Sequence, residues 1–169
     1  HWLSSSKPKW SILYRAKRLG KDGKVFELLK FRTMCVGADK MGGSSTSDDD
    51  VRITKIGKFL RKTKLDEIPQ LWNIVRGELG LIGWRPESQA YLHTIPREVL
   101  QTKPGIIGLG TLSDMDEGAE LAGKEDPDKY YEEVILPRKR ELELYYVRNK
   151  SFWLDIRIVL LTVWKLVRR

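Results

Sequence analysis

The pattern of apolar and polar positions predicts a helix that begins near residue 68. Apolar side chains recur there at the spacing of one helical face, at Ile68, Leu71, Trp72, Val75 and Leu79. We expect this face to be buried. A proline at position 69 is tolerated only near the first turn, where backbone N–H groups lack internal partners. The preceding Asp66 and Glu67 are therefore expected at the helix N-terminus, the positive end of the helix dipole.

Two strands are predicted earlier in the chain, at residues 10–18 and 25–34. The turn between them, at residues 20–23, contains an Asp-Gly step, which is typical of a β-hairpin when it separates apolar-rich runs. Lys30 and Arg32 share a face of the second strand, because side chains alternate with a period of two. Two such cations usually belong to a solvated surface, and they become candidates for a site only if they face the acidic pair.

The next two segments differ in composition. Residues 37–50 are rich in Gly, Ser and Asp and have no periodicity, which predicts a loop. Its three final aspartates could bind a metal, but composition favours a solvated acidic loop. Residues 52–62 carry five Lys or Arg side chains and predict a short helix with three side chains turned inward: Ile56, Phe59 and Leu60. A basic approach to a helix N-terminus suits a phosphate group.

Glycine and proline mark two later loops. Residues 80–87 predict a tight loop that presents Arg85, followed by a helix at residues 88–100. Residues 103–110 predict a second turn whose glycines would let backbone approach a phosphate, although their spacing matches neither a Walker loop nor a dinucleotide fingerprint. Residues 118–146 are charged and mostly helical, with interruptions at two prolines, and we interpret their charges as pairing on a solvated face.

The C-terminal residues 151–169 predict an amphipathic helix. Its polar residues form a narrow stripe, made of Ser151, Asp155, Thr162, Lys165 and Arg169, and the remainder is mostly apolar. Nineteen residues with internal charges make a poor membrane span. A helix in the membrane interface, with its basic end near anionic headgroups, and a helix of the protein core both remain open.

Together these elements predict an α+β fold, mainly helical with an N-terminal β-hairpin. We expect one domain over residues 1–169, with the interfacial helix at residues 151–169. The chain begins with His1 and not Met, which suggests a fragment.

The charge balance narrows the function. A formal net charge of +8, from 31 Lys and Arg against 23 Asp and Glu, indicates a polyanionic partner: nucleic acid, a phosphorylated substrate or an anionic membrane. A single cysteine, Cys35, excludes an internal disulfide and is expected to be buried or half-buried. With only two histidines, the chain is a poor candidate for a zinc site or a Ser-His-Asp mechanism.

The residues by themselves leave several functions open. Asp66 and Glu67 are either catalytic carboxylates or ordinary first-turn acids, with Thr63 and Asp66 as a capping-box-like pair. A basic nucleic-acid-binding module would bind oligonucleotides in a salt-sensitive way and would have no use for Asp66. A non-catalytic membrane-surface module is the third possibility.

A resemblance then separates these alternatives. Motifs that follow one another along nearly the whole chain resemble the bacterial monotopic phosphoglycosyl transferases, also called bacterial sugar transferases. They include Lys30-Phe31-Arg32-Thr33-Met34, Arg52-Ile53-Thr54, Leu65-Asp66-Glu67-Ile68-Pro69-Gln70-Leu71, Gly83-Trp84-Arg85-Pro86-Glu87, Lys103-Pro104-Gly105-Ile106-Ile107-Gly108 and Ser151-Phe152-Trp153-Leu154-Asp155.

The resemblance implies a monotopic membrane-associated catalytic domain. It implies transfer of a sugar-1-phosphate from a UDP-sugar to a membrane polyprenyl phosphate, with release of UMP, as the first membrane step of glycoconjugate biosynthesis. It implies Asp66 as the nucleophile that forms an acyl-phosphate, and Glu67 as its catalytic neighbour. Both are expected to bind Mg²⁺. The expected substrate and phosphate contacts are Lys30, Arg32, Arg61, Arg85 and Pro86.

The implied partners are the UDP-sugar, the lipid phosphate and the membrane surface, without nucleic acid, at the cytoplasmic face of the bacterial inner membrane. Family members carry a re-entrant membrane helix before the hairpin, and its absence here agrees with a fragment. Two features depart from the family. Trp84 stands where proline is usual, and residues 111–141 resemble a charged insertion found in a subgroup. The sugar and the glycan pathway cannot be read from the residues.

Overall fold

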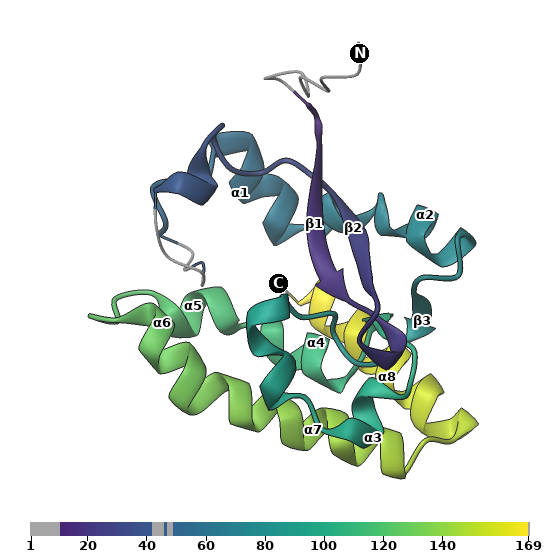
Figure 1. Ribbon diagram of the computed structural model, residues 1–169. Helices are drawn as coiled ribbons and strands as arrows, with labels where there is room; N and C mark the ends of the chain where they lie inside the picture. Colours follow the sequence, from purple (N-terminus) through teal and green to yellow (C-terminus); the bar gives the residue numbers. More distant parts are fainter. Residues whose placement is uncertain (1–10, 42–45, 47–48, 169) are drawn as a thin grey trace, which may run out of the picture.

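The computed structural model describes residues 11–41, 46 and 49–168, and combines helices with short strands (Figure 1). In Figure 1 the N-terminal hairpin runs downwards between α1 (Lys55–Lys62), on its left, and α2 (Gln70–Val75), on its right, towards the helices of the C-terminal half. This arrangement confirms the predicted mixture of helix and strand, mainly helical with an N-terminal hairpin.

β1 (Leu13–Leu19) and β2 (Val25–Phe31) form the predicted antiparallel hairpin in continuous register. Their turn, η1 (Lys21–Gly23), has positive φ values at Asp22 and Gly23, as expected of an Asp-Gly hairpin turn. The hairpin tip lies against α3 (Arg97–Leu100). The second strand ends before the predicted residue 34, so the segment that follows β2 is free to turn towards α1.

A sharp reversal joins α1 to the acidic pair. The Thr54 hydroxyl caps α1 by accepting a hydrogen bond of 2.9 Å from the Gly57 N–H. After α1 the chain turns at Lys64, which adopts a left-handed backbone with φ of 58°. The turn η3 (Leu65–Glu67) then leads through Pro69 into α2, the helix that the apolar periodicity predicted.

The predicted burial of the apolar faces of α1 and α2 is wrong. Four of the five periodic side chains around α2 are exposed: Ile68, Leu71, Trp72 and Val75, with Trp72 exposed to 58%. Only Leu79, beyond the end of α2, is buried. In α1, Ile56 and Phe59 are also exposed, and Leu60 is only half-buried.

The buried face of this segment is polar instead, and consists of Asp66, Glu67, Gln70 and Asn73. Asn73 explains the inversion. Its amide oxygen accepts the Leu29 N–H at 3.0 Å, and its amide nitrogen donates to the Glu27 carbonyl at 2.8 Å. The edge of β2 therefore presents backbone groups that an apolar helix face would leave unsatisfied.

The two glycine-rich loops contain a second, parallel pair of strands, β3 (Gly80–Ile82) and β4 (Gly105–Ile107). A Cβ atom on Gly105 would lie 2.3 Å from the Gly83 nitrogen, and one on Gly108 would lie 2.0 Å from the Gly83 carbonyl oxygen. These glycines therefore allow two backbone segments to cross closely. The sequence had instead predicted that these glycines would let the backbone approach a phosphate group.

Trp84, the departure from the family pattern, anchors the loop after β3. Its side chain is buried with Leu19, Ile95 and Val99, and its indole N–H donates to the Thr102 carbonyl at 3.1 Å. The helix predicted at residues 88–100 is divided into η4 (Gln89–Thr94) and α3, because Pro96 interrupts it.

The charged segment contains α4 (Leu109–Asp114), α5 (Glu117–Leu121), α6 (Pro127–Tyr130), the π-turn η5 (Tyr131–Ile135) and α7 (Leu136–Arg148). α7 packs against α3 and α4. The predicted solvated-face pairing is wrong for Lys139, Arg140 and Glu143 of α7, which are all buried. Lys139 and Arg140 pair with Glu87 of the loop after β3, and Glu143 accepts a hydrogen bond from the backbone N–H of Arg85 in the same loop.

The last helix, α8 (Phe152–Val167), turns its polar stripe towards the protein. Asp155 accepts the Tyr146 hydroxyl at 2.8 Å, Thr162 is buried, and Lys165 donates to the Leu112 carbonyl at 2.9 Å. Its outer face exposes apolar side chains, among them Trp153, Leu160, Trp164 and Val167. Each helix in the described ranges is too short or too polar to cross a bilayer.

Cys35 and Asp50 lie near the two ends of the acidic loop, residues 37–50. Cys35 is exposed and not buried as expected, because it lies beyond the end of β2 in a turn beside η2 (Ala38–Lys40). Asp50 forms an ion pair of 2.6 Å with Arg52. Residues 42–45, 47 and 48 lie outside the described residues, so the structure does not bear on the three-aspartate metal site.

Candidate active site

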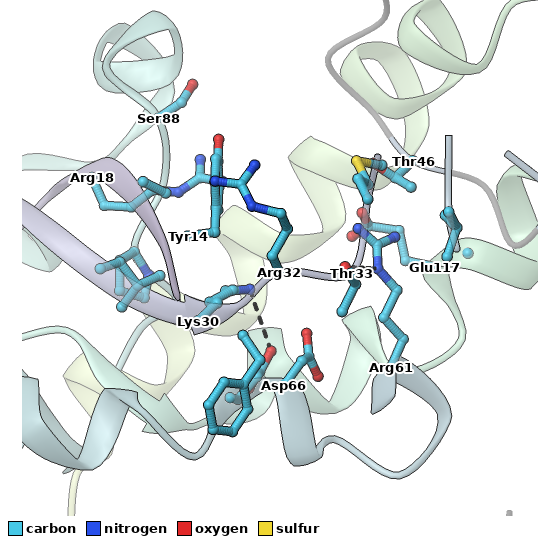
Figure 2. Close-up of a pocket in the computed structure, with 18 of the residues that line it drawn as sticks. Tyr14, Arg18, Lys30, Arg32, Thr33, Thr46, Arg61, Asp66, Ser88 and Glu117 are labelled. Carbon is cyan, nitrogen blue, oxygen red and sulfur yellow. Dashed lines mark hydrogen bonds and ion pairs between the residues drawn. The ribbon is translucent and has the colours of Figure 1, made fainter. Parts of the chain in front are cut away.

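Asp66 lines an open pocket of about 900 Å³, to which the hairpin, α1, η3 and the loop after β3 contribute (Figure 2). All the residues predicted for the site line this same pocket: Lys30, Arg32, Arg61, Asp66, Glu67, Arg85 and Pro86. The fold thus brings together segments that are distant in sequence. The chemical roles of these residues remain predictions.

The Glu67 carboxylate joins three of these segments. Its Oε1 lies 3.2 Å from Arg85 Nη2 and 3.5 Å from Lys30 Nζ, so one oxygen links η3 to β2 and to the loop after β3. Burial raises the pKa of Glu67, but the positive charges of Arg85, Lys30 and Lys64 outweigh burial and hold this pKa well below its usual range. Glu67 is therefore a fixed anion at neutral pH.

The neighbouring Asp66 has a different environment. It is buried, and its Oδ1 has no hydrogen-bond partner among the described residues. Burial raises the pKa of Asp66 above the ordinary value of 3.8, opposed by the charge of Lys30. An oxygen without a partner, in a poorly solvated place beside cations, is available to attack an electrophile or to bind a metal ion.

Lys30 is the titratable cation of the site. Burial lowers the pKa of Lys30 to about 8, although the attraction of Glu67 opposes this shift. Because an amine is cationic below its pKa, Lys30 carries its charge at neutral pH and loses it as the pH rises past 8. Figure 2 shows Lys30 directed towards the acidic pair from the hairpin.

The alternative interpretation, in which the acids only begin a helix, finds little support. The Thr63 hydroxyl donates backwards to the Phe59 carbonyl at 2.9 Å and does not form a capping box with Asp66. No side chain caps η3, and Asp66 makes no capping hydrogen bond to backbone N–H groups. Asp66 is therefore not explained by helix capping.

Arginines from separate segments also line the pocket. Arg61 Nε donates to Thr33 Oγ1 at 2.9 Å, and Arg32 Nε donates to the Ser11 carbonyl at 2.9 Å. Arg32 also lies 5.8 Å from the centre of the Tyr14 ring. Figure 2 shows Arg18, Arg32 and Arg61 reaching the pocket from different sides. A ligand with more than one phosphate would meet cations along its length.

A buried ionic network holds the loop that presents Arg85. Lys139 and Arg140 of α7 bind Glu87, with Lys139 Nζ 3.0 Å from Glu87 Oε1 and Arg140 Nη2 3.4 Å from it. Arg140 also pairs with Glu143, whose Oε1 accepts the Arg85 N–H at 3.3 Å. α7 therefore fixes the backbone of the loop at Arg85, whose side chain pairs with Glu67.

The same network gives its two glutamates, Glu87 and Glu143, different pKa values. Burial raises the pKa of Glu87, yet Lys139 and Arg140 more than compensate and lower it to about 2. Burial raises the pKa of Glu143 to about 7, because its single arginine neighbour only partly offsets burial. Two carboxyl groups therefore hold the loop: Glu87, which is charged at neutral pH, and Glu143, which titrates near neutrality.

The pocket also contains residues that the sequence did not single out, including Tyr14, Arg18, Gln70, Glu117 and Lys139. The predicted hairpin could have identified Tyr14 and Arg18 as pocket residues. In the antiparallel register Tyr14 lies opposite Lys30, and alternation places Arg18 on the same face. No sequence pattern could have identified Glu117 and Lys139, because they come from the charged segment after residue 110. The place of this segment in the pocket wall depends on tertiary packing.

Asp66 is the residue best suited to bind a divalent cation. Mg²⁺ usually binds one or two protein carboxylates and completes its shell with phosphate oxygens and water. The unpartnered Oδ1 of Asp66 fits this role, whereas Oε1 of Glu67 already faces Lys30 and Arg85. In the part of the chain that the structure describes, no group of three His, Cys, Asp or Glu could hold a metal alone. The site therefore fits a Mg²⁺ shared with a phosphorylated ligand.

Comparison with known proteins adds to this geometry. A family model described as bacterial sugar transferase matches residues 2–169. The chain is 36% identical to the UDP-glucose:undecaprenyl-phosphate glucose-1-phosphate transferase of Klebsiella pneumoniae, over 93% of the chain and 33% of the relative. It is 36% identical to the UDP-galactose-lipid carrier transferase of Erwinia amylovora, with coverages of 93% and 33%.

A third relative, the UDP-N-acetylgalactosamine-undecaprenyl-phosphate N-acetylgalactosaminephosphotransferase of Aeromonas hydrophila, is 32% identical, over 90% of the chain and 34% of the relative. The chain thus spans about one third of the length of these three relatives. Their names specify three different sugars, so similarity at this level does not identify a sugar for this chain.

The opposite environments of the two acids predict opposite effects on stability. For Glu67, whose folded pKa is lowered, the charge stabilises the fold above its unfolded pKa and this contribution is lost as the pH falls. Glu67→Gln should therefore lower the free energy of unfolding at pH 7 by about 1.5–3 kcal/mol, since Lys30 and Arg85 lose their shared anion. For Asp66, whose folded pKa is raised, ionisation costs stability at pH 7, so Asp66→Asn should leave stability unchanged or increased.

Urea denaturation of both variants and the wild type at pH 7 measures these differences. Asp22→Asn at the exposed hairpin tip is the control, with an expected change within about 0.5 kcal/mol. Equal losses in the Asp66 and Glu67 variants would contradict the distinction drawn between the two carboxylates.

Proposed function

Because this chain belongs to the bacterial sugar transferase family, we propose that it transfers a sugar-1-phosphate from a UDP-sugar to a polyprenyl phosphate. The observation that carries the proposal is the buried Asp66 carboxylate, whose Oδ1 has no partner among the described residues and which lies beside Lys30 and the Glu67–Arg85 pair. A nucleic-acid-binding surface would have no use for a buried carboxylate at the centre of its cations.

In the first half of the reaction, an Asp66 oxygen attacks the phosphorus that carries the sugar. The bond between this phosphorus and the oxygen that bridges it to the nucleoside phosphate breaks, and its electron pair leaves with UMP. The product is an acyl-phosphate that joins Asp66 to the sugar phosphate. Lys30, Arg32, Arg61 and Arg85 would offset the repulsion between an anionic nucleophile and an anionic phosphoryl group.

In the second half, a terminal oxygen of the polyprenyl phosphate attacks the same phosphorus. The bond to Asp66 breaks, the carboxylate is regenerated, and a polyprenyl diphosphate sugar is released. Two transfers through one carboxylate divide a difficult displacement into two easier ones. Both attacks use the same cations, so one set of phosphate contacts serves both halves of the reaction.

Mg²⁺ would be held by Asp66, with a lesser contribution from Glu67, and would supply electrostatic neutralisation of the transferring phosphate. Glu67 has a second role in this proposal. It keeps Arg85 and Lys30 oriented towards the pocket, and it reduces their mutual repulsion before the substrate arrives.

The polyprenyl phosphate acceptor is a membrane lipid, so the site has to be accessible from a bilayer. The outward-facing apolar sides of several helices provide a basis for this access. α1, α2 and α8 all expose apolar side chains, and the polar sides of α2 and α8 face the protein. Exposed Trp and Leu side chains with basic residues nearby are typical of surfaces that lie in a membrane interface. We propose that these faces rest on a bilayer at the cytoplasmic side, so that lipid phosphate reaches Asp66 without leaving the membrane.

Covalent trapping tests the central step. After incubation with Mg²⁺ and labelled UDP-glucose, UDP-galactose or UDP-N-acetylgalactosamine, without acceptor, the wild type should retain label as an acyl-phosphate that hydroxylamine removes. Asp66→Asn should retain none and should lose turnover by roughly 1,000-fold or more. Glu67→Gln should label slowly, because it disturbs the cations but keeps the attacking oxygen.

Asp22→Asn, at the exposed hairpin tip, is the control and should label like the wild type. A folded Asp66→Asn protein that retains turnover would falsify the proposed mechanism. Label on Glu67 would leave the transferase activity standing and exchange the roles of the two acids. Absence of UMP release with every UDP-sugar, together with salt-sensitive oligonucleotide binding, would favour the nucleic-acid alternative.

The rate of UMP release should depend on pH through Lys30. Activity should fall as the pH rises past about 8, because Lys30 loses its charge there. On the acid side it should fall as Asp66 is protonated, above the ordinary Asp pKa of 3.8. Lys30→Arg keeps the charge at high pH and should move the alkaline limb upwards by at least one pH unit, roughly, since an Arg pKa exceeds 12. Lys24→Arg, on an exposed lysine, should leave the profile unchanged, and an unmoved limb in Lys30→Arg would exclude Lys30 as its source.

Membrane contact by α8 has a separate test. Leu160→Glu combined with Trp164→Glu should lower partition into vesicles with anionic phospholipid at least about tenfold, because two apolar side chains are removed from the interface. Lys129→Glu changes the net charge equally, by two units, on an exposed residue of α6, and should have a much smaller effect. Unchanged partition, or unfolding of the double variant, would assign this face of α8 to the protein core.

A further inference from the structure

Two amide side chains on the buried face of the α2 segment have opposite environments. Asn73 is fully hydrogen-bonded: it binds the backbone at Leu29 and Glu27 and donates to Glu78 Oε2 at 2.6 Å. Gln70, one helical turn earlier, is 3% exposed, and its Nε2 has no hydrogen-bond partner among the residues the structure describes. Asn73 therefore has a structural role that Gln70 lacks.

An amide buried in this way destabilises a fold. Leaving a buried donor unsatisfied costs about 1–3 kcal/mol, and such groups are few in native proteins. A methionine or leucine of similar size would avoid this cost at position 70. A polar residue at such a position requires an explanation that the folded protein alone does not provide.

The location of Gln70 points to the explanation. It lines the same pocket as Asp66, Lys30 and Arg85. It follows Asp66 by four residues in a stretch of helical backbone from Leu65 to Val75, and residues four apart lie on the same side of a helix. The Asp66 Oδ1 is likewise buried without a partner. A donor and an acceptor without partners thus lie on one face, in one pocket.

We propose that the Gln70 amide is a catalytic hydrogen-bond donor to a non-bridging oxygen of the phosphoryl group that Asp66 attacks. This role rests on the proposed function. As the Asp66 oxygen bonds to phosphorus and the bond to the leaving UMP oxygen breaks, the amide N–H donates to a phosphoryl oxygen and transfers no proton. The phosphoryl oxygen supplies the hydrogen-bond acceptor that Gln70 lacks among the described residues. This oxygen lies next to the attacking Asp66 carboxylate.

The amide differs from the cations around it in what it can contribute. Lys30, Arg32 and Arg61 supply charge that acts over several ångströms and attracts the whole diphosphate. A neutral N–H acts only on the atom it touches, and the buried Gln70 is preorganised for one oxygen. Its effect should therefore appear mainly in the rate of the chemical step and less in the UDP-sugar concentration that gives half the maximal rate.

The first test compares stability with activity. Gln70→Met should raise the melting temperature by about 2–5 °C, since it removes an unsatisfied buried amide. The same change should slow the first turnover of UMP release about 100–1,000-fold, the range found for single preorganised donors. Asn73→Leu should lower the melting temperature, and Gln101→Met, on an exposed residue, should alter neither quantity.

The second test identifies the contacted atom. The substrate is a UDP-sugar in which sulfur replaces one non-bridging oxygen on the sugar-bearing phosphorus, with its two diastereomers measured separately. If Gln70 contacts one of these oxygens, the rate penalty for one diastereomer should shrink at least about threefold in Gln70→Met relative to the wild type. A purely structural glutamine would leave both penalties unchanged.

The outcomes separate this inference from the function on which it rests. A wild type that releases no UMP from any UDP-sugar would overturn both. An active wild type with an equally active Gln70→Met variant would overturn the role of Gln70 alone. A Gln70→Met protein that melts below the wild type, or whose two sulfur penalties match those of the wild type, would likewise show that the amide serves the fold.

Discussion

The arrangement of this site depends on one carboxylate. Glu67 Oε1 lies between Lys30 of β2 and Arg85 of the loop after β3, and without its charge these two cations would repel each other at the centre of the pocket. The left-handed turn at Lys64 brings η3 beneath the hairpin and so places Glu67 between them. Its neighbour Asp66 has no such engagement, which leaves that carboxylate available for chemistry. Two adjacent acids of similar chemistry are thereby separated into a structural anion and a reactive one.

The helices around this centre are inverted relative to those of an ordinary globular domain. The α2 segment buries Asp66, Glu67, Gln70 and Asn73, and α8 directs its polar stripe inward, while large apolar side chains face outward. Within the described ranges, the buried apolar residues form three small clusters and no single large core. Polar contacts therefore hold the elements together to an unusual degree, and the exposed apolar faces are available to a bilayer. In the proposed function this inversion serves both the site and its lipid substrate.

The charged segment completes the site from the opposite direction. Lys139, Arg140 and Glu143 of α7 are buried beneath the loop that carries Arg85, and Glu117 and Lys139 line the pocket. Trp84 fixes the other end of that loop through its packing with Leu19 and Val99. The sequence resemblance implied proline at position 84, which would restrict the backbone directly, whereas this chain has a buried indole and an ionic network there. Tertiary contacts thus fix the loop geometry at position 84.

Local patterns in the sequence determined the hairpin, the helix after Pro69, the helix start at Pro127, and the acidic and basic residues gathered at the pocket, because turn chemistry, periodicity and motif spacing act over a few residues. The predicted interruption at Pro137 is wrong, since helical backbone continues without a gap from Pro127 to Arg148. The direction of each helix face was decided only in three dimensions. Periodicity shows that Trp72 and Asn73 lie on different sides of α2, but which side is buried depends on the backbone edge of β2, which Asn73 satisfies. The burial of Lys139, the exposure of Cys35 and the unpartnered amide of Gln70 likewise depend on contacts between distant segments, which no local pattern encodes.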